Sequence, residues 1–522
     1  MSETSSAHPE NSQSSATMTI ADLDFGPIRE KYDLATEFPE AVETAAARAQ
    51  DAFADARVDA RDLPFVTIDP PGSKDLDQAV LIRRGTEVAS EGFTLYYAIA
   101  DVGAFVRPGD PVDVEARRRG ETVYLPDGNV PLHPRILSES IASLVASEDR
   151  PAVLWQLEFD STAALTRARV RRALIHVRER LDYPTLQGQY DLGERLPEPI
   201  ALLPEFGALR EERGRARGAI ELQLPEQDLE FDGTAWQLRL EPRTRMDAWN
   251  AECSLATGFA AARIMLAGGV GLLRTLPAPD DETVARFFRA ARALGIRVNS
   301  ADSPGMLLAS LDPTDPATLA LNSAATRLLR GSGYLAFTER PTAESTWHAG
   351  VASEYAHATA PIRRLGDRFV SEACLSYGEH WVDLREKDLS ITGSVPPEIL
   401  EALPELPGLL QSSGQRSAAV ENEAINLAEA VALRDSVNEV FDAGLLRGGD
   451  GDHHAEIFVY QPPVIAQCRG DVPHGKRIRV RLVEANVAER RVRFAYPADT
   501  PPATTTEAKV PENPRVQDTP RG

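Results

Sequence analysis

Three aspartates stand within nine residues, directly after a short apolar run. The run from Val66 to Ile68 is rich in β-branched residues, which predicts a buried strand, and the Pro-Pro-Gly sequence at 70–72 breaks it into a loop. Asp69, Asp75 and Asp77 fall in or beside this loop. Mg²⁺ prefers oxygen ligands and usually takes one or two carboxylates together with water and substrate phosphate. The segment is therefore a candidate magnesium site, although clustered aspartates at such turns are more often solvated.

Length and cysteine content set broad limits on the chain. Its 522 residues are enough for two or three domains with a large core. Cys253, Cys374 and Cys468 lie far apart, which indicates neither a zinc site nor a disulfide framework and fits a reducing, cytoplasmic environment. The polar N-terminus has no apolar core, and no apolar run approaches the roughly 20 residues that span a bilayer. We therefore expect neither export nor contact with a membrane.

The net charge of -23 argues against a nucleic-acid partner, because phosphate binding usually shows as a basic surface. Twelve acidic and four basic residues lie in 1–60, outside the aspartate cluster. Residues 161–220 instead hold eleven arginines and eight acids. A basic internal groove for a single strand is one interpretation of this region. The other is that most of these arginines form surface ion pairs.

Hydrophobic patterning divides the chain into a strand-rich part and a helical part. Strands are predicted over 93–99, 152–159 and 168–177. Helices are predicted over 37–59, 246–266, 281–294, 316–329, 364–377 and 417–440, with a Pro-rich link at 396–407. Four short strands, 455–460, 464–468, 477–484 and 490–496, have the spacing of a small barrel.

Several further blocks follow the aspartate cluster in a fixed order. They are Tyr96–Val106, Asp113–Gly120, Tyr124–Asp127, Pro131–Arg135, Ser138–Leu144 and Tyr355–Asp367. Together with the cluster they resemble the RNB family of exoribonucleases, of ribonuclease II and ribonuclease R type, over roughly residues 61–432. The resemblance implies an α+β fold: a mixed sheet surrounded by helices, followed by a small OB-like barrel.

The resemblance also suggests a division of the chain. We expect a disordered N-terminus at 1–20, a helical lead segment at 21–60, the RNB catalytic domain at 61–432, a truncated OB-like RNA-binding domain at 433–497 and a disordered tail at 498–522. The family usually carries two cold-shock domains before the catalytic core. Here one predicted helix leads straight into the aspartates, so we expect a short form without these domains.

The family pattern implies a role for each acid. Asp69 matches a magnesium ligand, Asp77 matches the acid whose loss abolishes cleavage, and Asp75 matches a supporting catalytic acid. The family has a fourth aspartate, a second metal ligand, where this chain has Gln78. A carboxamide oxygen can coordinate Mg²⁺ but brings no charge, so Gln78 is predicted to be a weaker metal ligand. Mn²⁺ is an alternative cofactor.

The arginines and tyrosines of the pattern are predicted to handle RNA. Arg363 matches the arginine that contacts the phosphate, and Arg364 matches the basic residue beside it. Tyr124 matches an aromatic that stacks on the terminal base, and Tyr183 matches a second active-site tyrosine. The family's other base clamp falls on Leu222, which has no ring.

Two glutamates are candidates for lining the RNA path. Glu252 and Glu421 match family positions of this kind, but an adjacent family glutamate is Ala251 here. His348 lies one residue out of register with a family histidine and is predicted to be structural.

The leading hypothesis is a Mg²⁺-dependent 3′-to-5′ exoribonuclease that hydrolyses single-stranded RNA to nucleoside 5′-monophosphates. It is expected to act as a cytoplasmic monomer without an obligatory protein partner. The alternative is a catalytically weakened or inactive RNB-fold regulator that binds RNA, motivated by Gln78 and the acidic balance. A third hypothesis, a hydrolase of small phosphorylated molecules, leaves the terminal barrel without a purpose.

Overall fold

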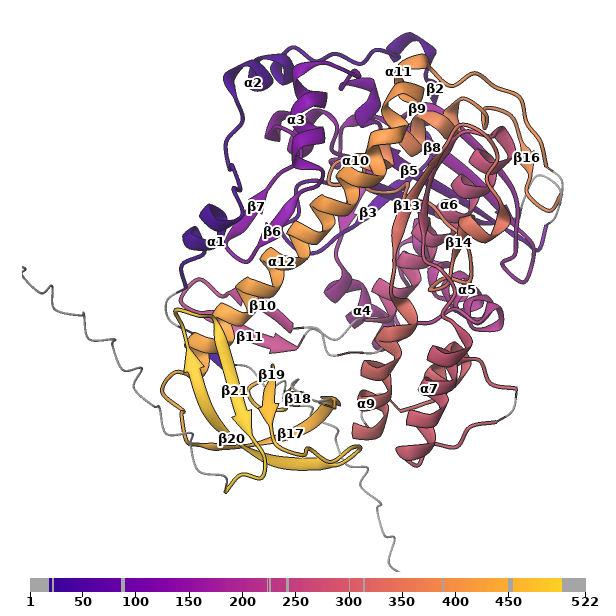
Figure 1. Ribbon diagram of the computed structural model, residues 1–522. Helices are drawn as coiled ribbons and strands as arrows, with labels where there is room; N and C mark the ends of the chain where they lie inside the picture. The colour runs from indigo at the N-terminus through magenta and orange to yellow at the C-terminus, as the bar shows by residue number, and fades with distance from the viewer. Residues whose placement is uncertain are drawn as a thin grey trace, which may run out of the picture.

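The computed structural model describes residues 18–20, 23–85, 90–222, 224, 227–240, 244–299, 301–312, 315–386, 389–448 and 454–499. A large body carries a curved sheet and most of the helices, and a small barrel lies at one end of it (Figure 1). The predicted α+β architecture with a C-terminal barrel is confirmed. None of the described helices is long and apolar enough to cross a membrane.

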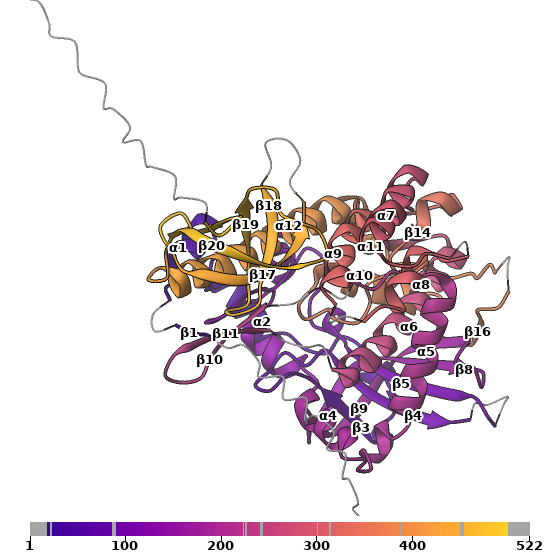
Figure 2. The ribbon, with the colours of Figure 1, turned by 90° about the horizontal axis from the view of Figure 1, so that it is seen from below.

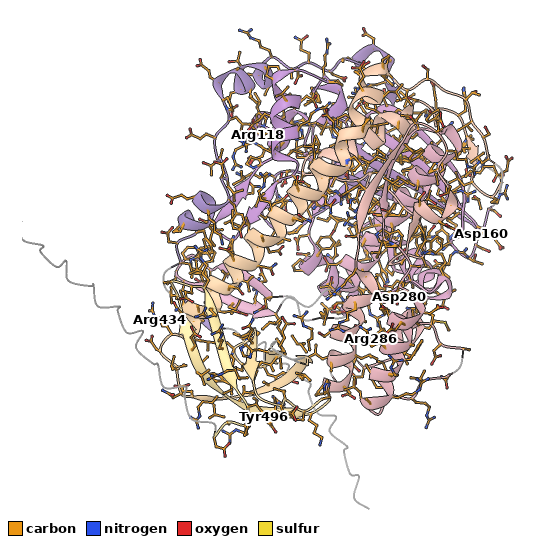
Figure 3. The ribbon with its side chains drawn as sticks, in the orientation of Figure 1. Arg118, Asp160, Asp280, Arg286, Arg434 and Tyr496 are labelled. Carbon is orange, nitrogen blue, oxygen red and sulfur yellow. The ribbon has the colours of Figure 1, made fainter. Side chains whose placement is uncertain are left out.

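Seven strands form the central sheet, in the order β16-β9-β3-β4-β5-β8 with β2 beside β9. Their bounds are β2 Val58–Asp59, β3 Phe65–Ile68, β4 Gln78–Arg84, β5 Phe93–Ala100, β8 Asp149–Phe159, β9 Leu165–Leu181 and β16 Val382–Asp383. The long β9 pairs with β8 over residues 165–176 and with β3 over residues 177–181, so the sheet closes on itself. Asp160 marks the turn between β8 and β9 in Figure 3.

Helix α6 is the main support behind the sheet. It runs over Arg245–Gly268 and begins with a capping box in which Thr244 and Asp247 bond to each other's backbone N–H groups. Its small residues allow close packing: a side chain at Gly258 would collide with the Tyr355 ring and the Ala356 carbonyl. This contact seats the 355–364 segment directly against the helix.

Helix α12 crosses the whole molecule and ends at the barrel (Figure 1). It runs over Leu406–Leu433 and packs against β13 of the larger body and against β20 and β21 of the barrel. The remaining helices are α1 Gly26–Lys31, α2 Glu40–Ala47, α3 Pro111–Arg119, α4 Tyr183–Asp191, α5 Leu203–Arg217, α7 Asp281–Ala293, α8 Pro304–Ala309, α9 Pro316–Ala325, α10 Leu365–Leu375 and α11 Pro397–Ala402.

Small sheets fill the space around the main one. Strand β1, Met18–Ile20, pairs with the hairpin of β10 Gln227–Phe231 and β11 Trp236–Leu240. The other pairs are β6 Val123–Leu125 with β7 Gly128–Val130, β12 Gly271–Thr275 with β13 Gly333–Phe337, and β14 Trp347–His348 with β15 Ser353–Glu354. Figure 2 shows the β1, β10 and β11 sheet next to the barrel.

The C-terminal barrel is closed, in the order β17-β18-β19-β21-β20. Its strands are β17 Val440–Arg447, β18 Ala455–Val459, β19 Val464–Arg469, β20 Arg477–Asn486 and β21 Arg491–Ala495. Tyr496, just after β21, is labelled at the lower edge in Figure 3. The sequence predicted four strands; β17 is the fifth and pairs with both β18 and β20, which closes the barrel.

Four sequence-based boundaries are wrong, and one of them is that of the helix predicted over 417–440, which runs over Leu406–Leu433. The helix predicted over 37–59 is confined to Glu40–Ala47, because Pro39 starts it and the chain turns at Arg48. The link predicted at 396–407 contains α11 and the first two residues of α12, since Pro397 and Pro407 occupy first-turn positions that helices tolerate. Of the segment predicted to be disordered at 1–20, Met18–Ile20 forms a strand with β11, and 1–17 lie outside the described residues.

Candidate active site

The aspartate loop is held at both ends by the central sheet. The Asp69 backbone N–H donates to the Leu181 carbonyl of β9, at 3.1 Å, so the loop leaves β3 without losing the sheet. At the other end the Asp77 carbonyl accepts from the Ala100 N–H, at 2.9 Å. Between them the Leu76 side chain is buried and its N–H donates to the Ser143 hydroxyl. The backbone of Asp69 and the backbone of Asp77 are therefore both held by hydrogen bonds.

Asp77 is 4% exposed and only partly satisfied. Its Oδ1 accepts from the Ile362 backbone N–H at 2.8 Å. Its Oδ2 is 3.7 Å from Arg363 Nε and makes no hydrogen bond in the described residues. Burial raises the pKa of the Asp77 carboxyl well above its usual value, although Arg363 opposes the rise.

Asp69 and Asp75 differ in their surroundings. The Asp69 Oδ2 is buried without a hydrogen-bond partner in the described part of the chain, and burial raises the pKa of this carboxyl to about 6. Asp75 is partly exposed, and its Oδ2 accepts from the Tyr124 hydroxyl at 2.8 Å. Asp75 therefore already has a neutral donor, whereas Asp69 has an oxygen free for another ligand.

Arg363 lies in a loop held rigidly around it. Its carbonyl accepts from the Thr122 N–H at 2.9 Å, and the Ala360 N–H donates to Asp367 at 2.8 Å. Arg364 is bound to the same Asp367 carboxylate through Nε and Nη2, at 3.0 and 2.6 Å. Arg364 thus fastens the loop, while the Arg363 side chain is 44% exposed beside Asp77 and can reach a ligand.

The two predicted tyrosines have different hydrogen-bond partners. Tyr124, on β6, is 47% exposed and tethered to Asp75 through its hydroxyl. Tyr183 is the first residue of α4, and its hydroxyl accepts from the Asn250 side chain at 2.8 Å. Burial raises the pKa of both phenols, which keeps them neutral donors. Leu222 packs partly buried in the cluster around Phe287.

Gln78, the first residue of β4, has partners for both ends of its amide. Nε2 donates to the Thr359 carbonyl at 2.8 Å. Oε1 accepts from the Tyr97 hydroxyl and lies 3.4 Å from the Ser254 hydroxyl. Its role as a metal ligand stays a prediction, and such a role requires the oxygen to give up these hydroxyls.

The glutamate candidates are not brought to the acids by any contact that the structure shows. Glu252 lies on α6 two residues after Asn250, which turns it by about 200° from the face that carries Asn250 and Ser254. It forms a 3.4 Å ion pair with the buried Arg210 of α5. Glu421 is exposed on α12. Their RNA-lining roles stay predictions.

The arginine-rich segment favours the ion-pair interpretation. On β9, Arg167 pairs with Glu158 at 2.6 Å and Arg172 with Asp101 at 3.1 Å. On α5, Arg215 pairs with Glu212 at 2.9 Å. These three side chains bind carboxylates of the protein itself and are therefore not available to line a basic groove.

The donor set fits a hard cation. Within the described ranges no group of three or more His, Cys, Asp or Glu side chains could hold a metal. Two buried carboxylate oxygens, Asp69 Oδ2 and Asp77 Oδ2, nevertheless have no hydrogen bond. Mg²⁺ is commonly held by only one or two carboxylates, with water and substrate phosphate completing the shell.

Several groups that line the site were not identified from the sequence. The Ile362 N–H and the Thr359 carbonyl are backbone groups, which a sequence does not single out. Asn250 and Ser254 were hidden in a helix chosen for its apolar pattern. Their spacing of four residues on a mostly buried helix is the signal that could have identified a polar face.

The comparisons with known proteins agree with this geometry. Residues 57–376 match the RNB domain, and residues 439–496 match the RNase II-type exonuclease C-terminal S1 domain. The chain belongs to the RNB family. The closed C-terminal barrel accordingly matches an S1 domain, and its description as a truncated RNA-binding domain stays a prediction.

Relatives of this RNB-family chain include curated ribonucleases. Ribonuclease R of Escherichia coli is 33% identical over 331 residues, covering 60% of this chain and 39% of the relative. Ribonuclease R of Thermotoga maritima is 31% identical over 379 residues, covering 68% and 52%. The match thus spans between two fifths and about half of these relatives.

Solved structures share the fold. Mycoplasma genitalium RNase R in complex with ribose-methylated single-stranded RNA superposes with a TM-score of 0.77 at 17% identity, covering 90% of this chain and 77% of that chain. Yeast Ssd1, described as a pseudonuclease, superposes with a TM-score of 0.61 at 15% identity, covering 79% and 50%. The fold is therefore shared by an RNase R and by a pseudonuclease.

Proposed function

We propose that this protein is a Mg²⁺-dependent 3′-to-5′ exoribonuclease that hydrolyses single-stranded RNA to nucleoside 5′-monophosphates, with Mn²⁺ as an alternative cofactor. The observation that carries the proposal is the buried Asp77 carboxylate, whose Oδ2 faces the accessible Arg363 and has no hydrogen bond in the described residues. Membership of the RNB family and the ribonuclease R relatives support the reaction class.

The residues divide the work by position. Asp69 and the free oxygen of Asp77 would hold Mg²⁺, which supplies Lewis-acid activation of the phosphoryl group and of water when bound. Arg363 would contact the scissile phosphate and neutralise developing charge. Asp77 would orient the attacking water, because it lies beside Arg363 on fixed backbone.

The aromatic and basic neighbours would hold the strand. Tyr124 is exposed enough to stack on the terminal base, and Asp75 fixes its ring through the hydroxyl. Tyr183 would sit near the scissile phosphate as a neutral donor. Arg364 acts through Asp367 to hold the Arg363 loop, so its predicted contact with RNA becomes a positioning role.

The substrate and setting are part of the same proposal. Stacking tolerates any base, which suits degradation of RNA without sequence preference. Three free, buried cysteines fit a reducing cytoplasm. A monomer that needs no protein partner remains our expectation.

The test uses unpaired RNA labelled at its 5′ end, purified full-length protein, and Mg²⁺ or EDTA. We expect a ladder that shortens from the 3′ end, release of 5′-monophosphates, and loss of all products in EDTA. A hairpin with a 3′ overhang should stop digestion before the stem. Products with 3′-phosphates, or internal cuts in a circular RNA, would refute the proposal.

A second candidate is an RNB-fold protein that binds RNA without cleaving it. It is favoured by the neutral Gln78 and by the similarity to a structure described as a pseudonuclease. In the same assay this candidate predicts retention of the labelled RNA on the protein, with no shortening in either Mg²⁺ or Mn²⁺.

A further inference from the structure

We infer that Gln78 is a positioning residue that holds the Arg363 loop against Asp77, and that it does not ligate the metal. The inference rests on the proposed function and adds to it an assignment for the one position that departs from the family's aspartates. It also limits the protein ligands of the cation to Asp69 and Asp77.

The first step concerns the amide oxygen. Oε1 of Gln78 accepts from the Tyr97 hydroxyl and lies 3.4 Å from the Ser254 hydroxyl. These two hydroxyls are 2.9 Å apart and belong to β5 and α6, so both sit on regular structure. Tyr97 donates its proton to this oxygen, and the single proton of Ser254 goes to either Tyr97 or Gln78, so the oxygen faces two protein hydroxyls.

The second step concerns the amide orientation. Nε2 of Gln78 donates to the Thr359 carbonyl at 2.8 Å. The opposite orientation would set two carbonyl oxygens against each other, with no proton between them. The hydrogen bonds thus select one orientation, in which the oxygen faces Tyr97 and Ser254.

The third step concerns the loop. Gln78 holds it at Thr359, and Asp77 holds it three residues later at the Ile362 N–H, at 2.8 Å. Arg363 follows directly, with Nε 3.7 Å from Asp77 Oδ2. The consecutive side chains of Asp77 and Gln78 therefore both hydrogen-bond to the backbone just before Arg363. An ionised aspartate at position 78 would lack a proton for the Thr359 carbonyl, so the amide performs a task that the family's carboxylate cannot.

The test compares Gln78→Met with wild type. Methionine has similar length without polar atoms, and Tyr97 and Ser254 can still bond to each other. We expect Mn²⁺ affinity, measured by electron paramagnetic resonance of free Mn²⁺, to change less than about threefold. We expect kcat to fall about tenfold to a hundredfold with a smaller change in KM, because misplacing a catalytic group has an effect of this size.

A double-mutant cycle shows whether Gln78 acts through Arg363. In an Arg363→Ala background, Gln78→Met should reduce the remaining rate by less than about threefold. RNA affinity in EDTA, measured by fluorescence anisotropy, should show the same coupling. The binding measurements need no turnover, so they remain decisive for this inference if wild-type protein does not cleave RNA and the proposed function fails.

Different results would overturn different parts of the inference. A tenfold or greater loss of Mn²⁺ affinity in Gln78→Met would make Gln78 a ligand and overturn the inference. Independent, additive effects of Gln78→Met and Arg363→Ala would overturn the link to the loop. Gln78→Ala serves as a second variant, and failure of both variants to fold would show that the residue serves stability alone.

Discussion

Two buried aspartates that flank adjacent strands differ in the number of partners that bind their carboxylates. Asp77 precedes β4 and Asp101 follows β5, and the antiparallel pairing of these strands puts both residues near the same end of the two strands. Asp101 is 1% exposed and its Oδ2 is bound by Arg57 at 2.9 Å and Arg172 at 3.1 Å. Asp77 is 4% exposed, yet its Oδ2 has only Arg363, at 3.7 Å.

The difference separates a structural acid from a candidate catalytic one. A buried charge normally needs a paired, hydrogen-bonded partner, and Asp101 has two. The Asp77 Oδ2 atom has no such partner among the described residues, so its burial lowers the stability of the fold and leaves the oxygen available to a ligand. Burial alone does not distinguish the two residues, whereas the count of partners does.

The sharpest way to break the comparison is Asp77→Asn. We expect kcat for single-stranded RNA to fall by at least about a thousandfold, because the carboxylate that acts on metal and water is removed. RNA affinity should stay within a few fold, and stability should hold or rise, because a poorly paired buried charge is lost. Rate, anisotropy and urea unfolding measure the three quantities. A loss of affinity equal to the loss of rate would contradict this role.

The matched change, Asp101→Asn, should give the reverse pattern. Removing the charge weakens the ion pairs with Arg57 and Arg172, which keep Asp51 and Glu372 as partners, and should lower the free energy of unfolding by about 1 to 3 kcal/mol. The kcat of the folded fraction should stay within about threefold of wild type. Urea unfolding and steady-state cleavage test this, and a large loss of kcat in stable protein would make Asp101 part of the site.

Tyr124 extends the comparison to Asp75, whose partner is a neutral hydroxyl. Tyr124→Ala should raise KM for single-stranded RNA about fivefold to a hundredfold, in line with about 1 to 3 kcal/mol for one stacked base. Tyr124→Phe keeps the ring and should have a much smaller effect. Equal effects of the two changes would assign the role to the hydroxyl and its bond to Asp75.

Glu429 is a buried acid whose shown partners are neutral N–H groups. On α12, its Oε1 accepts from Gln227 at 2.7 Å and from the Ile465 N–H at 2.9 Å, which joins β10, α12 and the barrel. Burial raises the pKa of the Glu429 carboxyl to about 7. Its neutral form thus favours the folded state, and this stability is lost as pH rises through about 7.

Glu429→Gln should remove that pH dependence, because an amide oxygen can accept the same bonds and does not ionise. Relative to this variant, wild type should lose about 1 kcal/mol of unfolding free energy between about pH 6 and about pH 8. Thermal or urea unfolding at both pH values measures the difference. Parallel pH profiles for the two proteins would show that Glu429 does not titrate in this range.

The sequence predicted the regular parts of the molecule better than the contacts between them. The alternation in 93–99 and 152–159 and the apolar period of 246–266 correspond to β5, β8 and α6, because these elements bury their patterned faces. β17 was missed because the helix predicted over 417–440 took its first residue, Val440, and the rest of the run to Arg447 was assigned to no element.

At the site, the sequence could place Asp69, Asp77 and Arg363 only through the family resemblance. The bond that joins Asp77 to the 359–364 loop spans 285 positions and uses a backbone N–H, so no local pattern encodes it. Gln78 illustrates the same limit: its residue type suggested a weak ligand, and only its three partners suggest a different task. Tertiary contacts decide how many partners a buried group has, so only the folded structure shows this number.

The most direct measurement is a Mn²⁺ titration of wild type and Asp69→Asn, followed by electron paramagnetic resonance, with Asp101→Asn as the control. The account predicts that wild type binds Mn²⁺, that Asp69→Asn weakens binding at least about tenfold, and that Asp101→Asn leaves it unchanged. Unaltered Mn²⁺ binding in Asp69→Asn would contradict the claim that Oδ2 of Asp69 and Oδ2 of Asp77, between β3 and β4, form the metal site.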